Sequence, residues 1–180
     1  LKLFRQVSLV PNAKILDFGA NWGYGVAQFN AAGHDAIGFE LSTPRAGYSK
    51  HLNVSVVSDW SKINAHKPFD LAFSSHVLEH TANPKDALAR LASVLKPGGM
   101  LISVFPNGSD KFKELDPKSF QSLWGFVHPI MLNEAFLRAA LPLGPMYVGA
   151  LDDRVDEWDR SRDHTGTLTR DELLLIWVKP

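Results

Sequence analysis

The chain has 180 residues, 45% of them hydrophobic, and its 19 basic side chains balance 19 acidic ones. This length is typical of one domain with its own core, so we expect a single domain over residues 1–180. The absence of cysteine excludes disulfides and thiolate metal sites, and the balanced charge argues against nucleic-acid binding, because phosphate contacts need surplus Lys and Arg.

The longest uncharged apolar run, residues 139–151, is too short to span a bilayer and contains Pro142 and Pro145. We therefore expect no membrane insertion. No basic segment followed by an apolar stretch and a cleavage site is visible at the N-terminus, so the cytoplasm is the expected compartment. The chain begins at Leu1 instead of Met, which leaves open that it is a fragment.

Short apolar runs alternate with helical patterns through the first 105 residues. An amphipathic first segment, residues 1–9, favours a short helix that Pro11 breaks. Strands are predicted at residues 15–18, 36–39, 54–57, 69–74 and 100–105, and helices at residues 26–32, 44–51 and 85–95. Because these strands are apolar throughout, the pattern predicts a parallel sheet covered on both faces.

After residue 105 strands and helices no longer alternate regularly. Residues 107–126 form a long polar connection with interspersed aromatic residues, and Asn133 is a suitable N-cap for a helix over residues 134–141. Residues 146–151 and 173–178 are predicted strands, and the charged stretch between them, residues 152–172, is predicted to be a solvated, mobile loop. The aromatic residues of the connection either line an apolar acceptor pocket or anchor the loop on the core: Phe112, Phe120, Trp124 and Phe126.

Residues 17–23, Asp-Phe-Gly-Ala-Asn-Trp-Gly, join the first strand to the first helix. Glycines let backbone approach a ligand and aim free N–H groups at it. Asp17 lies in an apolar strand, where a carboxylate needs hydrogen bonds or a cation, and Glu40 ends the second strand, where dinucleotide folds bind both ribose hydroxyls. Asp59 could accept from an adenine amino group and Trp60 could cover the ring, although a helix or turn cap is the alternative for Asp59.

Together these motifs resemble those of class I S-adenosylmethionine-dependent methyltransferases. The matching segments are the acidic glycine loop at residues 17–23, the ribose-binding strand end at 38–42, the fourth-strand motif with its Leu-Glu-His at 69–80, and the Pro-Gly-Gly turn at 95–99. The resemblance implies a Rossmann-like three-layer α/β sandwich. Its mostly parallel seven-stranded sheet would have the order 3-2-1-4-5-7-6, with the last strand antiparallel. It also implies S-adenosylmethionine as cofactor and a small-molecule methyl acceptor, and it says nothing of oligomeric state.

The resemblance also implies which residues bind the cofactor. Asp17 and its loop would hold the amino-acid end, Glu40 the ribose, and Asp59 with Trp60 the adenine. The full expected set is Asp17, Gly19, Ala20, Asn21, Gly23, Glu40, Leu41, Asp59, Trp60, Ser75 and His76. Asn21 stands where the family often has glycine, but Asn tolerates left-handed backbone, so the loop should still form.

His80 and His128 are the candidate general bases, because histidine exchanges protons near neutral pH. Packing or capping of a short helix is the alternative for His80. Residues 76–80 also spell the metal-binding pattern H-x-x-E-H, which needs a regular helix and a distant third ligand. Because the segment directly follows a strand and is cut off by Pro84, we expect no metal site; a divalent-metal role for Glu79 and His80 is the alternative.

Two other functions are weighed against methyl transfer. A nicotinamide-dependent oxidoreductase needs G-x-G-x-x-G, which Gly19, Gly23 and Gly25 do not provide, and Asp17 would repel a pyrophosphate. A catalytically silent cofactor-binding module is the second alternative. Only 14 residues precede the first strand, and related enzymes often cover the acceptor with a longer N-terminal helical cap, which this chain would then lack.

Overall fold

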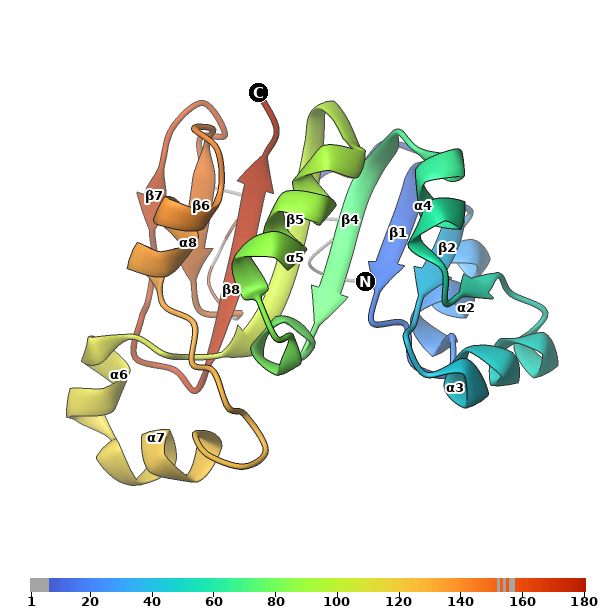
Figure 1. Cartoon of the computed structure of the whole chain (residues 1–180). Coiled ribbons are helices and arrows are strands. Elements are labelled where there is room, and N and C mark those ends of the chain that lie inside the picture. Colours follow the sequence, from blue (N-terminus) through green and yellow to red (C-terminus); the bar gives the residue numbers. More distant parts are fainter. Residues whose placement is uncertain (1–6, 152, 154, 156–157) are drawn as a thin grey trace.

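The computed structural model describes residues 7–151, 153, 155 and 158–180 (Figure 1). An 8-stranded sheet forms its centre, in the order β3-β2-β1-β4-β5-β8-β6-β7. The strands are β1 (Lys14–Phe18), β2 (Asp35–Phe39), β3 (Val56–Val57), β4 (Phe69–Ser75), β5 (Leu95–Pro106), β6 (Met146–Gly149), β7 (His164–Thr165) and β8 (Glu172–Val178). Most of the helix expected over residues 1–9 lies outside the described residues.

Strands β3, β2, β1, β4 and β5 are all parallel, and β8 is antiparallel to both β5 and β6. With β6 as the sixth expected strand and β8 as the seventh, the predicted order 3-2-1-4-5-7-6 and the antiparallel last strand are confirmed. The short β7, which the sequence analysis missed, adds a parallel edge strand beside β6.

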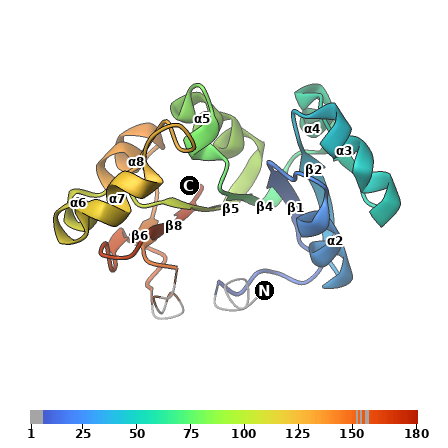
Figure 2. The same ribbon diagram turned by 90° about the horizontal axis from the view of Figure 1, so that it is seen from below.

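Helices cover both faces of the sheet, which gives the three predicted layers (Figure 2). The helices are α2 (Tyr24–Ala31), α3 (Thr43–Tyr48), α4 (Trp60–His66), α5 (Pro84–Val94), α6 (Asp110–Leu115), α7 (Pro117–Leu123) and α8 (Glu134–Ala140), with 3-10 turns η1 (Ser49–Leu52) and η2 (Leu78–His80). Successive residues of β1 pack into hydrophobic cores on opposite faces of the sheet. Ile15 packs in the same cluster as Val26 of α2. Leu16 packs in the other cluster, with Leu88 and Leu91 of α5. Burial on both faces explains why the strands are apolar throughout.

Two short helices, α6 and α7, replace the irregular connection that the sequence indicated. Ser109 and Asp116 cap them, each accepting a hydrogen bond from a backbone N–H in the first turn. Phe112 and Phe120 are buried, which favours the anchoring interpretation for these two aromatic residues. No helix of the described residues is both long enough and apolar enough to cross a bilayer.

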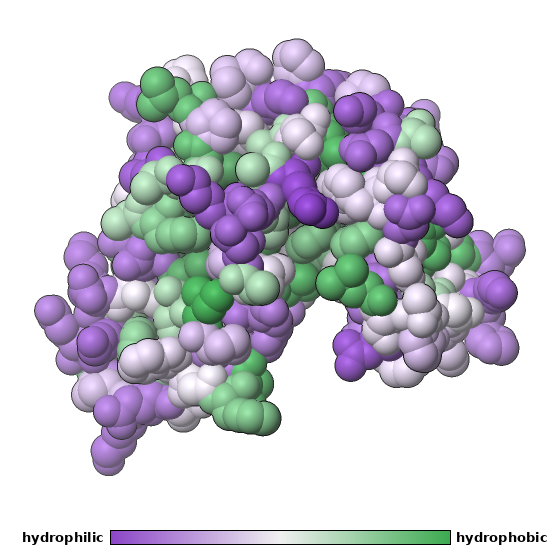
Figure 3. Space-filling model, in the orientation of Figure 1, coloured by the Kyte–Doolittle hydropathy of each residue, from purple (hydrophilic) through white to green (hydrophobic). Residues whose placement is uncertain are grey.

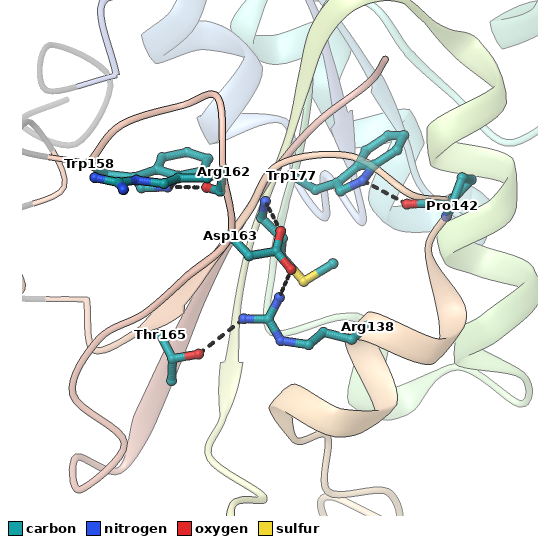
Figure 4. A network of polar contacts seen from close by, with 8 residues as sticks. Arg138, Pro142, Trp158, Arg162, Asp163, Thr165 and Trp177 are labelled. Atoms are coloured by element: carbon teal, nitrogen blue, oxygen red, sulfur yellow. Dashed lines mark hydrogen bonds and ion pairs between the residues drawn. The ribbon is translucent and has the colours of Figure 1, made fainter.

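Most of the charged stretch before β8 is exposed where the structure describes it, as expected of a solvated loop, but Val155, Trp158 and Leu168 are buried. Figure 4 shows Arg138 of α8 joined to Asp163 and Thr165. Asp163 also accepts a hydrogen bond from the backbone of Met146 at the start of β6. Trp158 is buried and donates to the backbone carbonyl of Arg162. These contacts attach the exposed segment to α8 and to the start of β6.

Candidate functional site

A cavity of about 700 Å³ opens where β1, β2 and β4 end. Figure 3 shows the surface hollowed at this edge, between the side that carries α3 and the side that carries α6 and α7. The lining residues are Phe18, Gly19, Asn21, Phe39, Glu40, Leu41, Arg45, Ser75, His76, Val77, His80, Thr81 and Ala82. The volume lies within the range of small-molecule sites, and parallel sheets bind ligands beyond their carboxyl strand ends.

The glycine loop lies against the turn that follows β4. Gly19 has φ +81°, and a Cβ at this position would lie 2.2 Å from a methyl carbon of Val77, so only glycine fits. The N–H groups of Gly19 and Ala20 both donate to the carbonyl of Phe39, at 2.8 and 3.0 Å. These two amides are therefore not free for a ligand, contrary to the expectation. Asn21 has φ 50°, which confirms that asparagine supports the left-handed turn here.

Glu40 is fixed at the wall of the cavity. One of its carboxylate oxygens accepts from the backbone N–H of Asn21 at 3.0 Å, and the other accepts from the N–H of Ser42 at 2.8 Å. A carboxylate has about four lone-pair sites, so each oxygen can still accept another hydrogen bond. The arrangement presents an oriented acceptor at the end of β2 and ties that strand to the glycine loop.

Asp17 is buried next to Gly25 and does not line the cavity. Its side chain is only 6% exposed, and burial raises its pKa from 3.8 to about 7. A Cβ at Gly25 would lie 2.4 Å from one Asp17 carboxylate oxygen, so the carboxyl occupies space left by that glycine at the start of α2. The sequence suggested hydrogen bonds or a cation for this carboxylate; burial instead favours its neutral form.

Four other expected residues also lie off the cavity wall. The Asp59 carboxylate caps α4 by accepting from the backbone N–H and hydroxyl of Ser61, and these hydrogen bonds hold its pKa below the usual range. Trp60 packs edge-on against Phe39, with ring centroids 5.0 Å apart, and so supports the wall from behind. Ala20 and Gly23 are buried within the loop itself.

The turn after β4 brings two histidines to one buried carboxylate. His76 has φ 53°, and its Nε2 lies 2.7 Å from a Glu172 carboxylate oxygen. Its Nδ1 lies 3.4 Å from Oε1 of Glu79, and that carboxylate is the main reason why the pKa of His76 is raised. Glu79 is 1% exposed, and neither of its carboxylate oxygens accepts a hydrogen bond from the described residues.

His80 and His128 lie side by side, with ring centroids 5.1 Å apart. His80 lines the cavity, and its Nε2 is 3.9 Å from Oε1 of Glu79. His128 comes from the connection after α7, and its Nδ1 is 2.7 Å from the carbonyl oxygen of Leu123. A carbonyl only accepts, so Nδ1 carries the proton in this contact, and the neutral ring then has its lone pair on Nε2. The two candidate bases, chosen separately from the sequence, thus meet in space.

Residues that the sequence analysis missed complete the wall. Arg45 of α3 and Val77 after β4 line the cavity, together with Phe18 and Phe39 at the strand ends. The two phenylalanines could have been found from their positions at the ends of β1 and β2. Arg45 carries no local signal, because only the folding of α3 against the strand ends brings it to the site.

Sequence comparison relates the chain to methyl-transferring proteins. The sequence model of a family described as "Methyltransferase domain" matches residues 2–141. A ubiquinone biosynthesis O-methyltransferase from Nitrobacter winogradskyi is 28% identical over 107 residues, 54% of this chain and 40% of that protein. A demethylmenaquinone methyltransferase from Renibacterium salmoninarum is 31% identical over 100 residues, 53% of this chain and 42% of that protein. The matched region thus spans about two fifths of the length of these curated relatives.

Solved structures share the fold at low identity. A SAM-dependent methyltransferase from Archaeoglobus fulgidus superposes with a TM-score of 0.67 at 15% identity, over 99% of this chain and 91% of that chain. The phosphoethanolamine N-methyltransferase 2 of Haemonchus contortus, solved in complex with S-adenosyl-L-methionine, gives 0.64 at 16% identity, over 99% of this chain and 51% of that chain. At these low sequence identities, the similarity establishes only that this chain shares their fold.

Proposed function

Since the chain belongs to the methyltransferase-domain family of S-adenosylmethionine-dependent enzymes, we propose that it transfers a methyl group from S-adenosylmethionine to a small-molecule acceptor in the cavity at the strand ends. The observation that carries the proposal is the Glu40 carboxylate, which two backbone amides orient at the cavity wall. The match to the methyltransferase-domain family also argues against a nicotinamide-dependent oxidoreductase.

The residues present fit the cofactor. Glu40 would accept from the ribose hydroxyls through the lone pairs that Asn21 and Ser42 leave free. Leu41 and Phe39 offer apolar surface beside it, and Gly19 keeps the loop close to the cavity. Asp17 is the proposed partner of the ammonium group. A cation bound near it would lower its pKa and favour the charged form.

The proposed chemistry requires the protein only to align the acceptor with the methyl group and to accept a proton from the acceptor. S-adenosylmethionine supplies an electrophilic methyl group on a sulfonium, a good leaving group. The cavity walls would hold the acceptor in line with that methyl group and exclude water. Where the acceptor is a hydroxyl, His80 at the wall or His128 beside it would take the proton, and the hydrogen bond to Leu123 leaves Nε2 of His128 available.

Titration calorimetry with S-adenosylhomocysteine tests the binding part of the proposal. Wild-type protein should bind one equivalent, and Glu40→Ala should bind about 10- to 100-fold more weakly, because hydrogen bonds to a charged group are worth about 1.5–3 kcal/mol. Glu114→Ala, which removes an exposed carboxylate from α6, is the matched control and should bind like wild type. Folded wild-type protein that binds none, or an unaffected Glu40→Ala, contradicts the proposal.

A methyl-release assay over a panel of hydroxyl- and amine-bearing metabolites tests turnover. Release of S-adenosylhomocysteine that depends on an acceptor supports the enzyme. Tight cofactor binding with no turnover on any acceptor would instead support the silent cofactor-binding module.

A further inference from the structure

Glu79 is the least satisfied charged side chain near the cavity. It is 1% exposed, and neither oxygen accepts a hydrogen bond from the described residues. The two nearby imidazoles, those of His76 and His80, both approach the same oxygen, Oε1, at 3.4 and 3.9 Å. A buried carboxylate normally pairs with a cation or accepts several hydrogen bonds, so Oε2 in particular lacks a partner of the expected kind.

The surroundings of Glu79 supply two further ligand atoms. One carboxylate oxygen of Glu79 and one ring nitrogen each of His80 and His128 all lie within 4.8 Å of one another. His128 reaches this group from the connection after α7, some fifty residues along the chain from His80. The cluster is therefore a product of the tertiary fold and differs from the H-x-x-E-H pattern, whose two histidines would be His76 and His80.

The hydrogen bonding of His128 suits a metal ligand. Histidines that bind metals usually donate their second ring N–H to a carbonyl or carboxylate, which fixes the tautomer and orients the ring. The Nδ1–H of His128 does this with the carbonyl of Leu123 at 2.7 Å, and Nε2 is left to coordinate. His80 is 43% exposed at its side chain and thus has room to turn its ring.

We infer that Glu79, His80 and His128 form a binding site for a divalent transition metal, with zinc the best match. Two imidazoles and one carboxylate form a known zinc ligand set, whereas magnesium and calcium prefer oxygen ligands. Ligand atoms around a tetrahedral zinc lie roughly 3.4 Å apart, given zinc–ligand bonds near 2.1 Å. Rotation of the two imidazoles therefore has to shorten the present separations by about an ångström.

Because the cluster lies at the cavity, a metal bound there could contact a molecule in the cavity. Three protein ligands leave the fourth zinc position open, and His80 lies on the cavity wall. An oxygen atom of a bound molecule could fill that position, where a metal would lower its pKa. The proton of that oxygen would then pass to solvent water, so the metal would replace base catalysis by the two imidazoles, which would be its ligands. Metal binding itself does not depend on the proposed function, because it can be measured without cofactor or acceptor.

Equilibrium dialysis of the protein against Zn²⁺ alone, with visible absorption of the Co²⁺-loaded protein, tests the inference. Wild-type protein should hold one equivalent of zinc, and bound Co²⁺ should show intense d–d bands of low-coordinate geometry. Glu79→Gln and His128→Asn should each weaken zinc binding by about 100-fold or more and abolish these bands, because losing a ligand costs at least as much as losing its second-shell support. His66→Asn, which removes an exposed histidine on α4, should behave like wild type.

If wild-type protein binds no stoichiometric zinc, Glu79 is an ion-pair partner of the neighbouring imidazoles and the inference is wrong. If both variants retain wild-type binding, the metal lies elsewhere and the inference is equally wrong. Circular dichroism checks that each variant folds. Since His128 is on a surface connection, its variant decides the matter if Glu79→Gln does not fold.

Discussion

Single side chains decide whether the cavity can act as the proposed site. Asn21 in left-handed conformation and Glu40 at the end of β2 were both predictable, because backbone sterics and strand-end geometry determine such positions locally. The burial of Glu79 and its approach to His128 were not predictable, because they depend on how the connection after α7 returns to the turn after β4. Asp59 caps α4 through its hydrogen bonds to Ser61, and its contact with an adenine amino group stays a prediction.

The buried carboxyl of Asp17 links stability to pH. Its pKa is raised from 3.8 to about 7 by burial, so the folded protein holds this proton over a pH range in which the unfolded chain has lost it. The carboxyl therefore favours folding fully below about pH 4. This stabilisation is lost progressively as the pH rises to about 7. At higher pH the carboxyl causes no further change in stability.

The Asp17→Asn variant isolates this effect from the other titrating groups. The difference in unfolding free energy between variant and wild type should move in favour of the variant by up to about 4 kcal/mol between pH 4 and pH 7, at about 1.4 kcal/mol per pKa unit. Urea denaturation of both proteins at several pH values gives this difference. A difference that does not change with pH would mean that Asp17 ionises normally in the folded state.

Among the elements, α5, the parallel strands and the Asn133-capped α8 were predictable, whereas α4, α6 and α7 were not. The apolar spacing of α5 and the five parallel strands follow directly from residues that face the two cores. In contrast, α6 and α7 have only 6 and 7 residues, too few to show a helical period in a polar segment. Tertiary packing of one aromatic side chain each, and the caps at Ser109 and Asp116, stabilise them.

Phe120 and Phe126 separate the two roles considered for the aromatic residues of this connection. Phe120 is 6% exposed and anchors α7, so Phe120→Ala should destabilise the protein by about 3–5 kcal/mol. Phe126 is fully exposed, so Phe126→Ala, the matched control, should leave the thermal midpoint unchanged. Thermal unfolding followed by circular dichroism measures both. Equal midpoints for the two variants would argue against α7 as an anchored element.

At the scale of the molecule, the strand order brings distant residues to one cavity. Because β1, β2 and β4 are parallel neighbours, residues near positions 20, 40 and 80 of the chain meet at one edge of the sheet. This convergence was predictable from the alternation of strands and helices. The position of α6 and α7 next to the carboxyl end of β5 was not, because it depends on the path of a connection that has no sheet register to fix it (Figure 1).

A crystal structure of the protein grown with S-adenosylhomocysteine tests the central claim most directly. Nucleoside density is expected in the strand-end cavity, with both ribose hydroxyls within hydrogen-bond distance of Glu40 and the sulfur directed toward His80. A nucleoside bound elsewhere, or a Glu40 carboxylate that retains only its contacts to Asn21 and Ser42 while the cavity holds the ligand in another orientation, would contradict it.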